Sequence, residues 1–238
     1  MVNLSIVIPC FNEDKNIFPL LGKIENLLIK DPNIEIIIVE NGSTDNTKNN
    51  ILNSRLNIDK KIIIHEIKKN LGYGYGIMSG VKITSGNFIG WCHADLQTEP
   101  EDIYNAYLQN FEKLKNDKVI IKGLRTNRNL FDKLFTLGMS IVASIIFQRI
   151  FSDINAQPKL FSKSFKALLT DYPYDFSLDL YLLIIAKINH YKIMNYKVVF
   201  KKRLYGEAKG GGNLKGKIKL IIRTFVYMFK LRKKIWKL

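Results

Sequence analysis

Short runs of apolar, mostly β-branched residues alternate with segments of helical periodicity through the first half of the chain. Four runs have the length of buried strands and end in turn-forming residues; they cover residues 4–11, 34–40, 61–67 and 87–94. Between the first two, apolar residues from Ile17 to Leu28 recur at helical spacing. Strands that alternate with helices are typical of βαβ units, so we expect an α/β fold with a mostly parallel sheet flanked by helices.

The alternation fades after a fifth apolar run at residues 119–125, and the charge also becomes uneven. Residues 1–153 carry 18 Lys and Arg against 17 Asp and Glu, whereas residues 154–238 carry 19 against 4. Most of the net charge of +16 therefore lies in the last third, which indicates a basic surface directed at phosphates. We expect one α/β domain over residues 1–212 and a basic, amphipathic helical extension over residues 213–238.

Composition and hydropathy limit the classes of protein to consider. Cys10 and Cys92 have neither metal-ligand spacing nor a disulfide framework, so we expect reduced core residues. The N-terminal segment reaches acidic residues within one strand length, so no secretory signal is expected. The apolar stretch of residues 134–148 is shorter than the roughly 20 residues of a membrane span, which predicts a buried or interfacial helix.

Polar residues follow three of the predicted strands, at residues 9–12, 40–45 and 93–97. The carboxyl ends of parallel strands meet at one edge of a sheet, and ligands bind in the crevice beyond it. The first of these loops has no glycine, and the glycines of residues 72–80 do not form the dinucleotide fingerprint after the first strand. The sequence therefore argues against a nicotinamide-dependent dehydrogenase.

Four segments resemble the family 2 glycosyltransferases of GT-A fold. They are SIVIPCFNE (5–13), IIIVENGSTDNT (36–47), the block from Asn70 to Pro100, and RLYGEAK (203–209). The first three match in order and spacing, and the last is a shorter match. The similarity is greatest to the branch that includes dolichyl-phosphate mannose synthases and bacterial polyprenyl-phosphate sugar transferases. It implies an inverting transfer from a nucleotide-sugar donor, such as a UDP- or GDP-sugar.

The resemblance also implies which residues hold the donor nucleotide. Matching positions in the first two strand-end loops are Pro9, Asn12, Glu13, Glu40, Asn41, Ser43 and Asp45. Glu40 and Asn41 stand where the family has Asp, so one charge is absent at Asn41. Asp45 has an equally good interpretation as the cap of the helix that follows.

In this family an Asp-x-Asp follows the fourth strand, and its second Asp binds a divalent cation on the donor diphosphate. Asp95 and Gln97 match the metal-binding positions, and His93 replaces the first Asp. Mg²⁺ and Mn²⁺ favour oxygen ligands, and one carboxylate with phosphate oxygens and water is sufficient for Mg²⁺. His93 can hydrogen-bond a ribose hydroxyl or ligate Mn²⁺ when neutral, so we expect a weaker site or one that favours Mn²⁺.

Departure of a nucleoside diphosphate requires nearby positive charge. Arg203, Lys209 and Arg125 match basic positions of related enzymes. A hydroxyl acceptor would also need a general base. Asp153 and Asp179 are the candidates, although Gln157 stands where the family has a glycine, which disturbs the match at Asp153. A polyprenyl phosphate would need little or no base, because its oxygen is already anionic.

Residues 213–238 contain nine Lys and Arg and no acid. Their apolar residues fall close to one helical face, namely Leu214, Ile218, Ile221, Ile222, Phe225, Phe229 and Trp236. A basic amphipathic helix with aromatic residues is typical of an interfacial anchor, so we expect a peripheral protein on the cytoplasmic face of an anionic membrane. The alternative is a helix that buries the same face against the catalytic domain.

Other functions remain open at the level of sequence. The same chemistry could act on a hydroxyl of a growing glycan in surface polysaccharide synthesis. A catalytically inactive nucleotide-binding scaffold is a further alternative. The basic C-terminal third would also suit nucleic acid, but none of the usual nucleic-acid motifs is present, and we do not expect such a partner.

Overall fold

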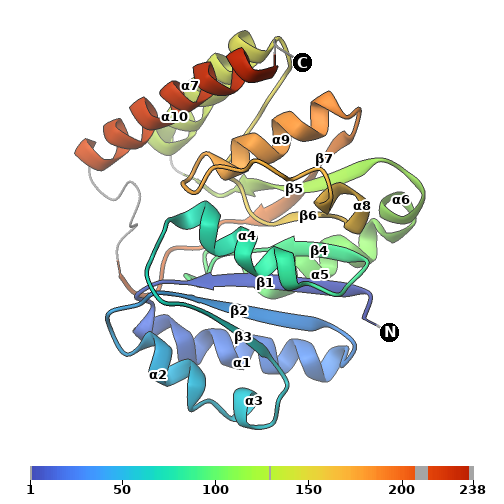
Figure 1. Ribbon diagram of the computed structural model, residues 1–238, viewed down its shortest axis with the longest axis vertical. Helices are drawn as coiled ribbons and strands as arrows, with labels where there is room; N and C mark the ends of the chain where they lie inside the picture. The colour runs from blue at the N-terminus through green and yellow to red at the C-terminus, as the bar shows by residue number, and fades with distance from the viewer. Residues whose placement is uncertain (1, 129, 207–213, 236–238) are drawn as a thin grey trace.

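The computed structural model describes residues 2–128, 130–206 and 214–235 of the 238-residue chain. A seven-stranded sheet with the order β3-β2-β1-β4-β6-β5-β7 lies at its centre (Figure 1). The strands are β1 (Leu4–Cys10), β2 (Glu35–Asn41), β3 (Ile63–Ile67), β4 (Phe88–Trp91), β5 (Val119–Thr126), β6 (Lys159–Ser162) and β7 (Lys192–Val199). Within the described chain, β6 alone runs antiparallel to its neighbours, so the predicted, mostly parallel α/β sheet is confirmed.

Helices cover both faces of the sheet, because alternate residues of each central strand point to opposite sides. Ile6 and Ile8 of β1 pack into one core, and Val7 packs into the other. The first core also takes in α1 (Asp14–Lys30), α2 (Thr47–Leu52), α3 (Arg55–Ile58), α5 (Pro100–Gln109) and α6 (Phe111–Asn116). The second takes in α4 (Tyr73–Ile83), α7 (Leu130–Phe147), α8 (Lys163–Lys166), α9 (Leu178–Ile188) and α10 (Leu214–Ile235).

The first five strands lie within a few residues of their predicted positions, and Cys10 and Cys92 are buried without forming a disulfide, as expected. Two strands, β6 and β7, were not predicted. The four-residue β6 has buried Lys159 at its first position, which hides the usual apolar strand pattern.

Helices α7 and α10 pack side by side at one edge of the molecule (Figure 1). Met228 and Leu231 of α10 are buried in the same core as Ala143 of α7. The outer faces of both helices are apolar and exposed, as described below. In the described part of the chain, no helix is both long and apolar enough to cross a membrane.

Candidate active site

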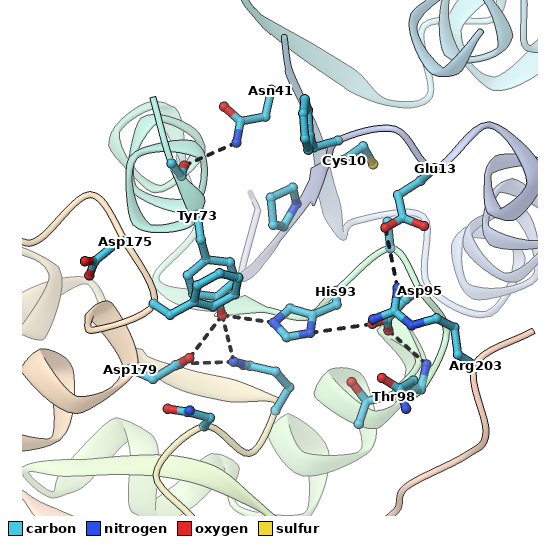
Figure 2. Close-up of a pocket in the computed structure, with 18 of the residues that line it drawn as sticks. Cys10, Glu13, Asn41, Tyr73, His93, Asp95, Thr98, Asp175, Asp179 and Arg203 are labelled. Carbon is cyan, nitrogen blue, oxygen red and sulfur yellow. Dashed lines mark hydrogen bonds and ion pairs between the residues drawn. The ribbon is translucent and has the colours of Figure 1, made fainter. Parts of the chain in front are cut away.

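A cavity of about 430 Å³ opens at the carboxyl ends of β1, β2 and β4, where the strand-end rule predicts a ligand site. Many of the residues expected from the sequence line it (Figure 2). These are Pro9, Glu13, Asn41, His93, Asp95, Gln97, Arg125, Asp179 and Arg203. Segments far apart in the sequence therefore form one wall, from the first strand-end loop to the loop after β7.

Other predicted donor-binding residues lie near the cavity but hold the loops behind its wall. The Glu40 carboxylate accepts hydrogen bonds from the backbone N–H groups of Gly42 and Ser43, at 3.3 and 2.6 Å. Asn12 accepts from the Thr44 N–H at 2.8 Å, and its own N–H donates to Ser43 Oγ at 3.1 Å. The Glu40 contacts stabilise the turn of the β2–α2 loop, and the Asn12 contacts hold this loop against the β1–α1 loop, beside the cavity-lining Asn41.

Asp45 lies in the same loop and supports the start of α2. Its carboxylate accepts hydrogen bonds from the N–H groups of Thr47 and Asp14, at 2.9 and 3.3 Å. Asp45 stands one residue before the N-cap position, Asn46, so it supports the first turn of α2 without being its cap residue. Lys209, the other predicted donor-binding residue away from the wall, lies outside the described residues.

Asp95 lies in the loop after β4 and is only 4% exposed. Its Oδ2 atom is 2.5 Å from Nη2 of Arg203, and its Oδ1 accepts the backbone N–H of Gln97 at 3.1 Å. Nη1 of Arg203 also lies 3.8 Å from Oε1 of Glu13. Arg203 therefore connects the first and fourth strand ends. The Gln97 side chain donates to the Lys201 carbonyl at 3.2 Å, which fixes the chain just before Arg203.

Tyr73, which the sequence analysis did not single out, connects two other residues of the cavity lining, His93 and Asp179. Its hydroxyl lies 2.9 Å from Nε2 of His93 and donates to Oδ2 of Asp179 at 3.1 Å (Figure 2). The ring stacks on Phe176, with centroids 4.6 Å apart. Burial, followed by the nearby Asp179 charge, raises the pKa of Tyr73 well above its ordinary value, so the hydroxyl stays protonated.

Gly72 lets Tyr73 reach this position. Gly72 has φ +123°, and a Cβ built there would lie 2.2 Å from the Tyr174 carbonyl oxygen. The same oxygen accepts the Gly74 N–H at 2.8 Å, so the first turn of α4 packs directly on the loop before α9. The glycines of this segment therefore serve a close backbone contact.

Asp179, one predicted base, lies in the cavity wall but is held by several donors. Its Oδ1 is 2.9 Å from the Lys159 ammonium and accepts from Gln157 Nε2 at 3.0 Å. Lys159 is fully buried and also donates to the Ile154 and Ala156 carbonyls, at 3.0 and 2.7 Å. Burial lowers the pKa of Lys159, and Asp179 opposes that shift. The arrangement suits a fixed support for Tyr73 better than a proton acceptor.

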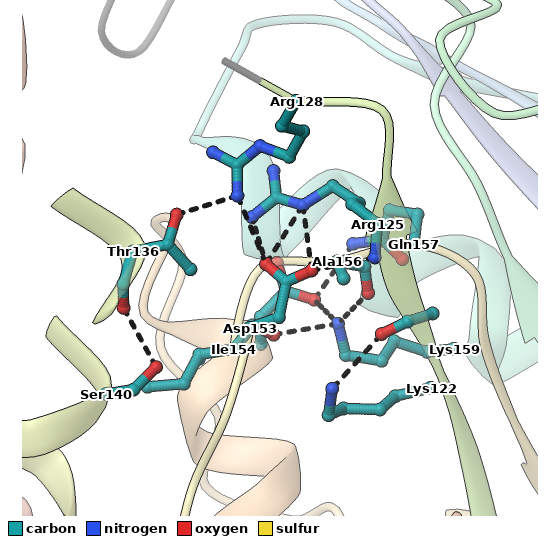
Figure 3. Close-up of polar contacts among 12 residues, drawn as sticks. Lys122, Arg125, Arg128, Thr136, Ser140, Asp153, Ile154, Ala156, Gln157 and Lys159 are labelled. Carbon is teal, nitrogen blue, oxygen red and sulfur yellow. Dashed lines mark hydrogen bonds and ion pairs between the residues drawn. The ribbon is translucent and has the colours of Figure 1, made fainter. Parts of the chain in front are cut away.

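Asp153, the other predicted base, lies behind the wall rather than in it. Arg125 contacts both carboxylate oxygens, and Arg128 lies 3.6 Å from Oδ1 (Figure 3). Burial alone would raise the pKa of Asp153, but the hydrogen bonds and charge of Arg125 outweigh it and hold the pKa below its ordinary value. Asp153 is thus a weak base whose contacts orient Arg125 toward the cavity.

Asp95 and His93 offer a carboxylate and an imidazole to a metal ion at this wall. Among the described residues, no three His, Cys, Asp or Glu side chains gather as a metal site. Asp95 and His93 lie together, with Oδ2 and Nδ1 3.9 Å apart. This donor set fits a divalent cation that takes its other ligands from phosphate and water, as Mg²⁺ and Mn²⁺ do.

The model of the family described as Glycosyl transferase family 2 matches residues 5–169. The chain belongs to this family. It is 30% identical to the dodecaprenyl-phosphate galacturonate synthase of Rhizobium johnstonii over 56% of this chain and 38% of that protein. It is 27% identical to an undecaprenyl-phosphate 4-deoxy-4-formamido-L-arabinose transferase of Salmonella choleraesuis over 61% of this chain and 43% of that protein. The predicted family is confirmed, and the predicted similarity to the polyprenyl-phosphate branch is found as well, although these matches span less than half of each relative.

Solved structures confirm the predicted GT-A fold. Glucosyl-3-phosphoglycerate synthase from Mycobacterium tuberculosis, in complex with Mn²⁺, UDP and glucosyl-3-phosphoglycerate, superposes with a TM-score of 0.69 and 16% identity. The similarity covers 97% of this chain and 80% of that one. Another structure of that enzyme, with UDP, gives a TM-score of 0.71 at 16% identity, over 98% of this chain and 80% of that one.

Proposed function

We propose that this protein is a metal-dependent, inverting glycosyltransferase that moves a sugar from a UDP- or GDP-sugar to a polyprenyl phosphate at a membrane surface. The observation that carries the proposal is the contact between Asp95 and Arg203 at the cavity wall. A nucleoside diphosphate needs cationic partners as it leaves, and this pair combines a carboxylate ligand for a metal ion with a guanidinium for phosphate oxygens.

The donor nucleotide would lie at the β1–β2 end of the cavity. Pro9, Glu13 and Asn41 line this end, and the loop contacts of Glu40 and Asn12 hold it in shape. Asn41 donates to the Gly72 carbonyl at 3.2 Å, which connects this end to α4. These groups bind and orient the base and ribose so that the diphosphate reaches Asp95 and Arg203.

The diphosphate would then meet two arginines. Arg203 would change partner from Asp95 to a phosphate oxygen, and Arg125, which is held by Asp153 and also lines the cavity, would supply a second guanidinium. Asp95 would hold a divalent cation, and the charge of that cation would help to stabilise the departing diphosphate. The acceptor oxygen forms its bond to the anomeric carbon from the side opposite the diphosphate, which leaves with the bonding electron pair.

A phosphate acceptor fits this wall better than a neutral hydroxyl. Asp153 and Asp179 are both held by cationic side chains, and neither is poised to take a proton. An anionic phosphate oxygen needs no such base. The relatives named for dodecaprenyl and undecaprenyl phosphate support the same class of acceptor.

Exposed apolar residues on α7 and α10 support an attachment to the membrane. On α7 they recur at helical spacing, at Leu130, Leu134, Leu137, Ile141 and Ile145. On α10 they are Ile218, Ile222, Val226 and Phe229. Together these residues form what we call the apolar helix face. With the basic residues of α10 beside it, this face would enter the boundary of an anionic bilayer, such as the cytoplasmic leaflet.

Donor hydrolysis tests the chemistry independently of the acceptor. Purified protein should release nucleoside diphosphate from one of a panel of UDP- and GDP-sugars when Mn²⁺ or Mg²⁺ is present, and a chelator should stop it. Vesicles that contain a polyprenyl phosphate should then become labelled with the sugar. Labelling of a glycan hydroxyl in place of the lipid would contradict the proposed acceptor. The absence of turnover with every donor would contradict the proposed catalytic activity.

A further inference from the structure

His93 stands between two polar groups that fix its orientation. Its Nε2 atom is 2.9 Å from the Tyr73 hydroxyl, and its Nδ1 atom is 3.9 Å from Oδ2 of Asp95 (Figure 2). The first distance is that of a hydrogen bond, and the second is too long for one. The two ring nitrogens are therefore not equivalent, and the partner of Nε2 decides what Nδ1 presents to the cavity.

The contacts of Tyr73 determine which nitrogen carries the proton. A carboxylate can only accept a hydrogen bond, so the Tyr73 hydroxyl is the donor in its hydrogen bond to Oδ2 of Asp179. Gln157 Nε2 donates to the same hydroxyl oxygen at 3.1 Å, and its orientation is fixed because it also donates to Asp179. The hydroxyl then has one acceptor position left for His93. A neutral His93 must accordingly carry its proton on Nε2 and leave a lone pair on Nδ1.

That lone pair faces another electron-rich atom, Oδ2 of Asp95. Arg203 approaches Oδ2 at 2.5 Å, but an ionised carboxylate oxygen has more than one acceptor position. Two acceptors 3.9 Å apart with no hydrogen bond between them are suited to sharing a cation. Imidazole nitrogen is a better ligand for Mn²⁺ than for Mg²⁺, which prefers oxygen.

We propose that His93 Nδ1 and Asp95 Oδ2 are paired ligands of the divalent cation, and that Tyr73 is the positioning residue that presents the Nδ1 lone pair. The proposal rests on the proposed function, because it assigns the ligands of the cation used there. It makes the site selective for Mn²⁺ over Mg²⁺. Asp179, Gln157 and Lys159 act through Tyr73, as the groups behind a metal-bound histidine commonly do.

Electron spin-echo spectroscopy of bound Mn²⁺ tests the ligand directly, because a coordinated imidazole nitrogen modulates the echo. The samples contain full-length protein with Mn²⁺ and UDP, or with Mn²⁺ and GDP. We expect nitrogen modulation that changes when histidine is labelled with ¹⁵N. His93→Gln should abolish it, whereas His190→Gln, a change at an exposed position, should keep it. The wild-type measurement with and without ¹⁵N-labelled histidine tests the proposal by itself, even where a variant fails to fold.

Tyr73→Phe tests the positioning role, because it removes the acceptor for Nε2–H but keeps the ring that stacks on Phe176. We expect Mn²⁺ affinity to fall ~10-fold, as for other groups behind a metal-bound histidine. Mg²⁺ affinity should change little, which a purely structural role would not produce. Mn²⁺ that binds without nitrogen modulation would overturn the proposal and leave the transferase function intact. Transfer that proceeds unchanged in a chelator would overturn both.

Discussion

Arg203 and Asp95, which are 108 residues apart in sequence, lie 2.5 Å apart through Nη2 and Oδ2 at the cavity wall. Arg203 belongs to the segment after β7, and Asp95 belongs to the loop after β4. The contact gives a carboxylate that is only 4% exposed a cationic partner across the cavity wall. A diphosphate with its cation would satisfy both groups separately.

Asp95→Asn should therefore reduce transfer at least ~100-fold with little loss of fold, because it removes the one anionic ligand and keeps the side-chain shape. Gln97→Ala should be milder, because the Gln97 side chain contacts the Lys201 carbonyl and its backbone N–H still reaches Asp95. Steady-state kinetics at several Mn²⁺ concentrations and a melting curve check both. Wild-type turnover by Asp95→Asn at every metal concentration would contradict the assignment.

His93→Asp restores the carboxylate that the family has at this position and should tighten Mg²⁺ binding by about 10-fold. The hard cation gains an anionic oxygen in place of an imidazole nitrogen. Calorimetric titration with Mg²⁺ in the presence of UDP or GDP measures the effect, and His190→Asp is the control for added charge at an exposed position. An unchanged Mg²⁺ affinity would mean that His93 does not face the cation.

The strand-end rule predicted the position of the cavity from sequence because β1, β2 and β4 are short, apolar and parallel. The rule did not show which of two neighbouring residues in a loop would point into the cavity. Asn41 lines the cavity, while the carboxylate of the neighbouring Glu40 is buried and accepts hydrogen bonds from the Gly42 and Ser43 N–H groups. Which of the two side chains faces the cavity depends on the alternation of side chains along β2 and on a turn at Gly42, whose φ is +71°.

Tyr73 and Lys159 were missed for a different reason. Tyr73 begins a helix, and its partners come from the loop after β4, the loop before β6 and the start of α9, between 20 and 106 residues later. Lys159 lies in an antiparallel strand and is buried only because Asp179 and two carbonyl groups surround its ammonium. Lysine is seldom buried without such partners, so no local pattern predicts it.

Lys122 gives a prediction about stability. Its side chain is 2% exposed and donates to the Gly123 carbonyl, and burial, with the nearby Lys159 charge, lowers its pKa to about 8. Between pH 8 and its ordinary value of 10.5 the unfolded chain binds more protons, so stability rises with pH in that window. Below pH 8, burial of the charged Lys122 lowers the free energy of unfolding by its full amount, on the order of 3 kcal/mol.

Lys122→Met should accordingly raise the free energy of unfolding at pH 7 and flatten its rise between pH 8 and 10.5. Urea unfolding at a series of pH values measures both effects. Lys113→Met, at an exposed position of α6, is the matched control and should change neither. A parallel pH dependence in Lys122→Met and wild type would show that Lys122 is not the group responsible.

The last prediction concerns the apolar helix face of α7 and α10. Ile141 and Ile222 are 49% and 58% exposed, so a single Glu at either position adds a charge without disturbing the core. Each change should weaken binding to anionic vesicles, because it places a carboxylate where apolar side chains enter the bilayer boundary. Removal of residues 213–238 should weaken binding further, since each basic residue near an anionic surface contributes about 1 kcal/mol, reduced by salt.

Co-sedimentation with anionic and neutral vesicles measures the binding. Ile29→Glu is the control, because Ile29 is 76% exposed on α1, which covers the opposite face of the sheet. It should bind like wild type, and wild-type binding should disappear on neutral vesicles and in high salt. Equal binding with and without residues 213–238 would rule out α10 as the anchor. Equal loss in Ile29→Glu and Ile222→Glu would show that added negative charge weakens binding wherever it lies, so that the apolar helix face has no special role.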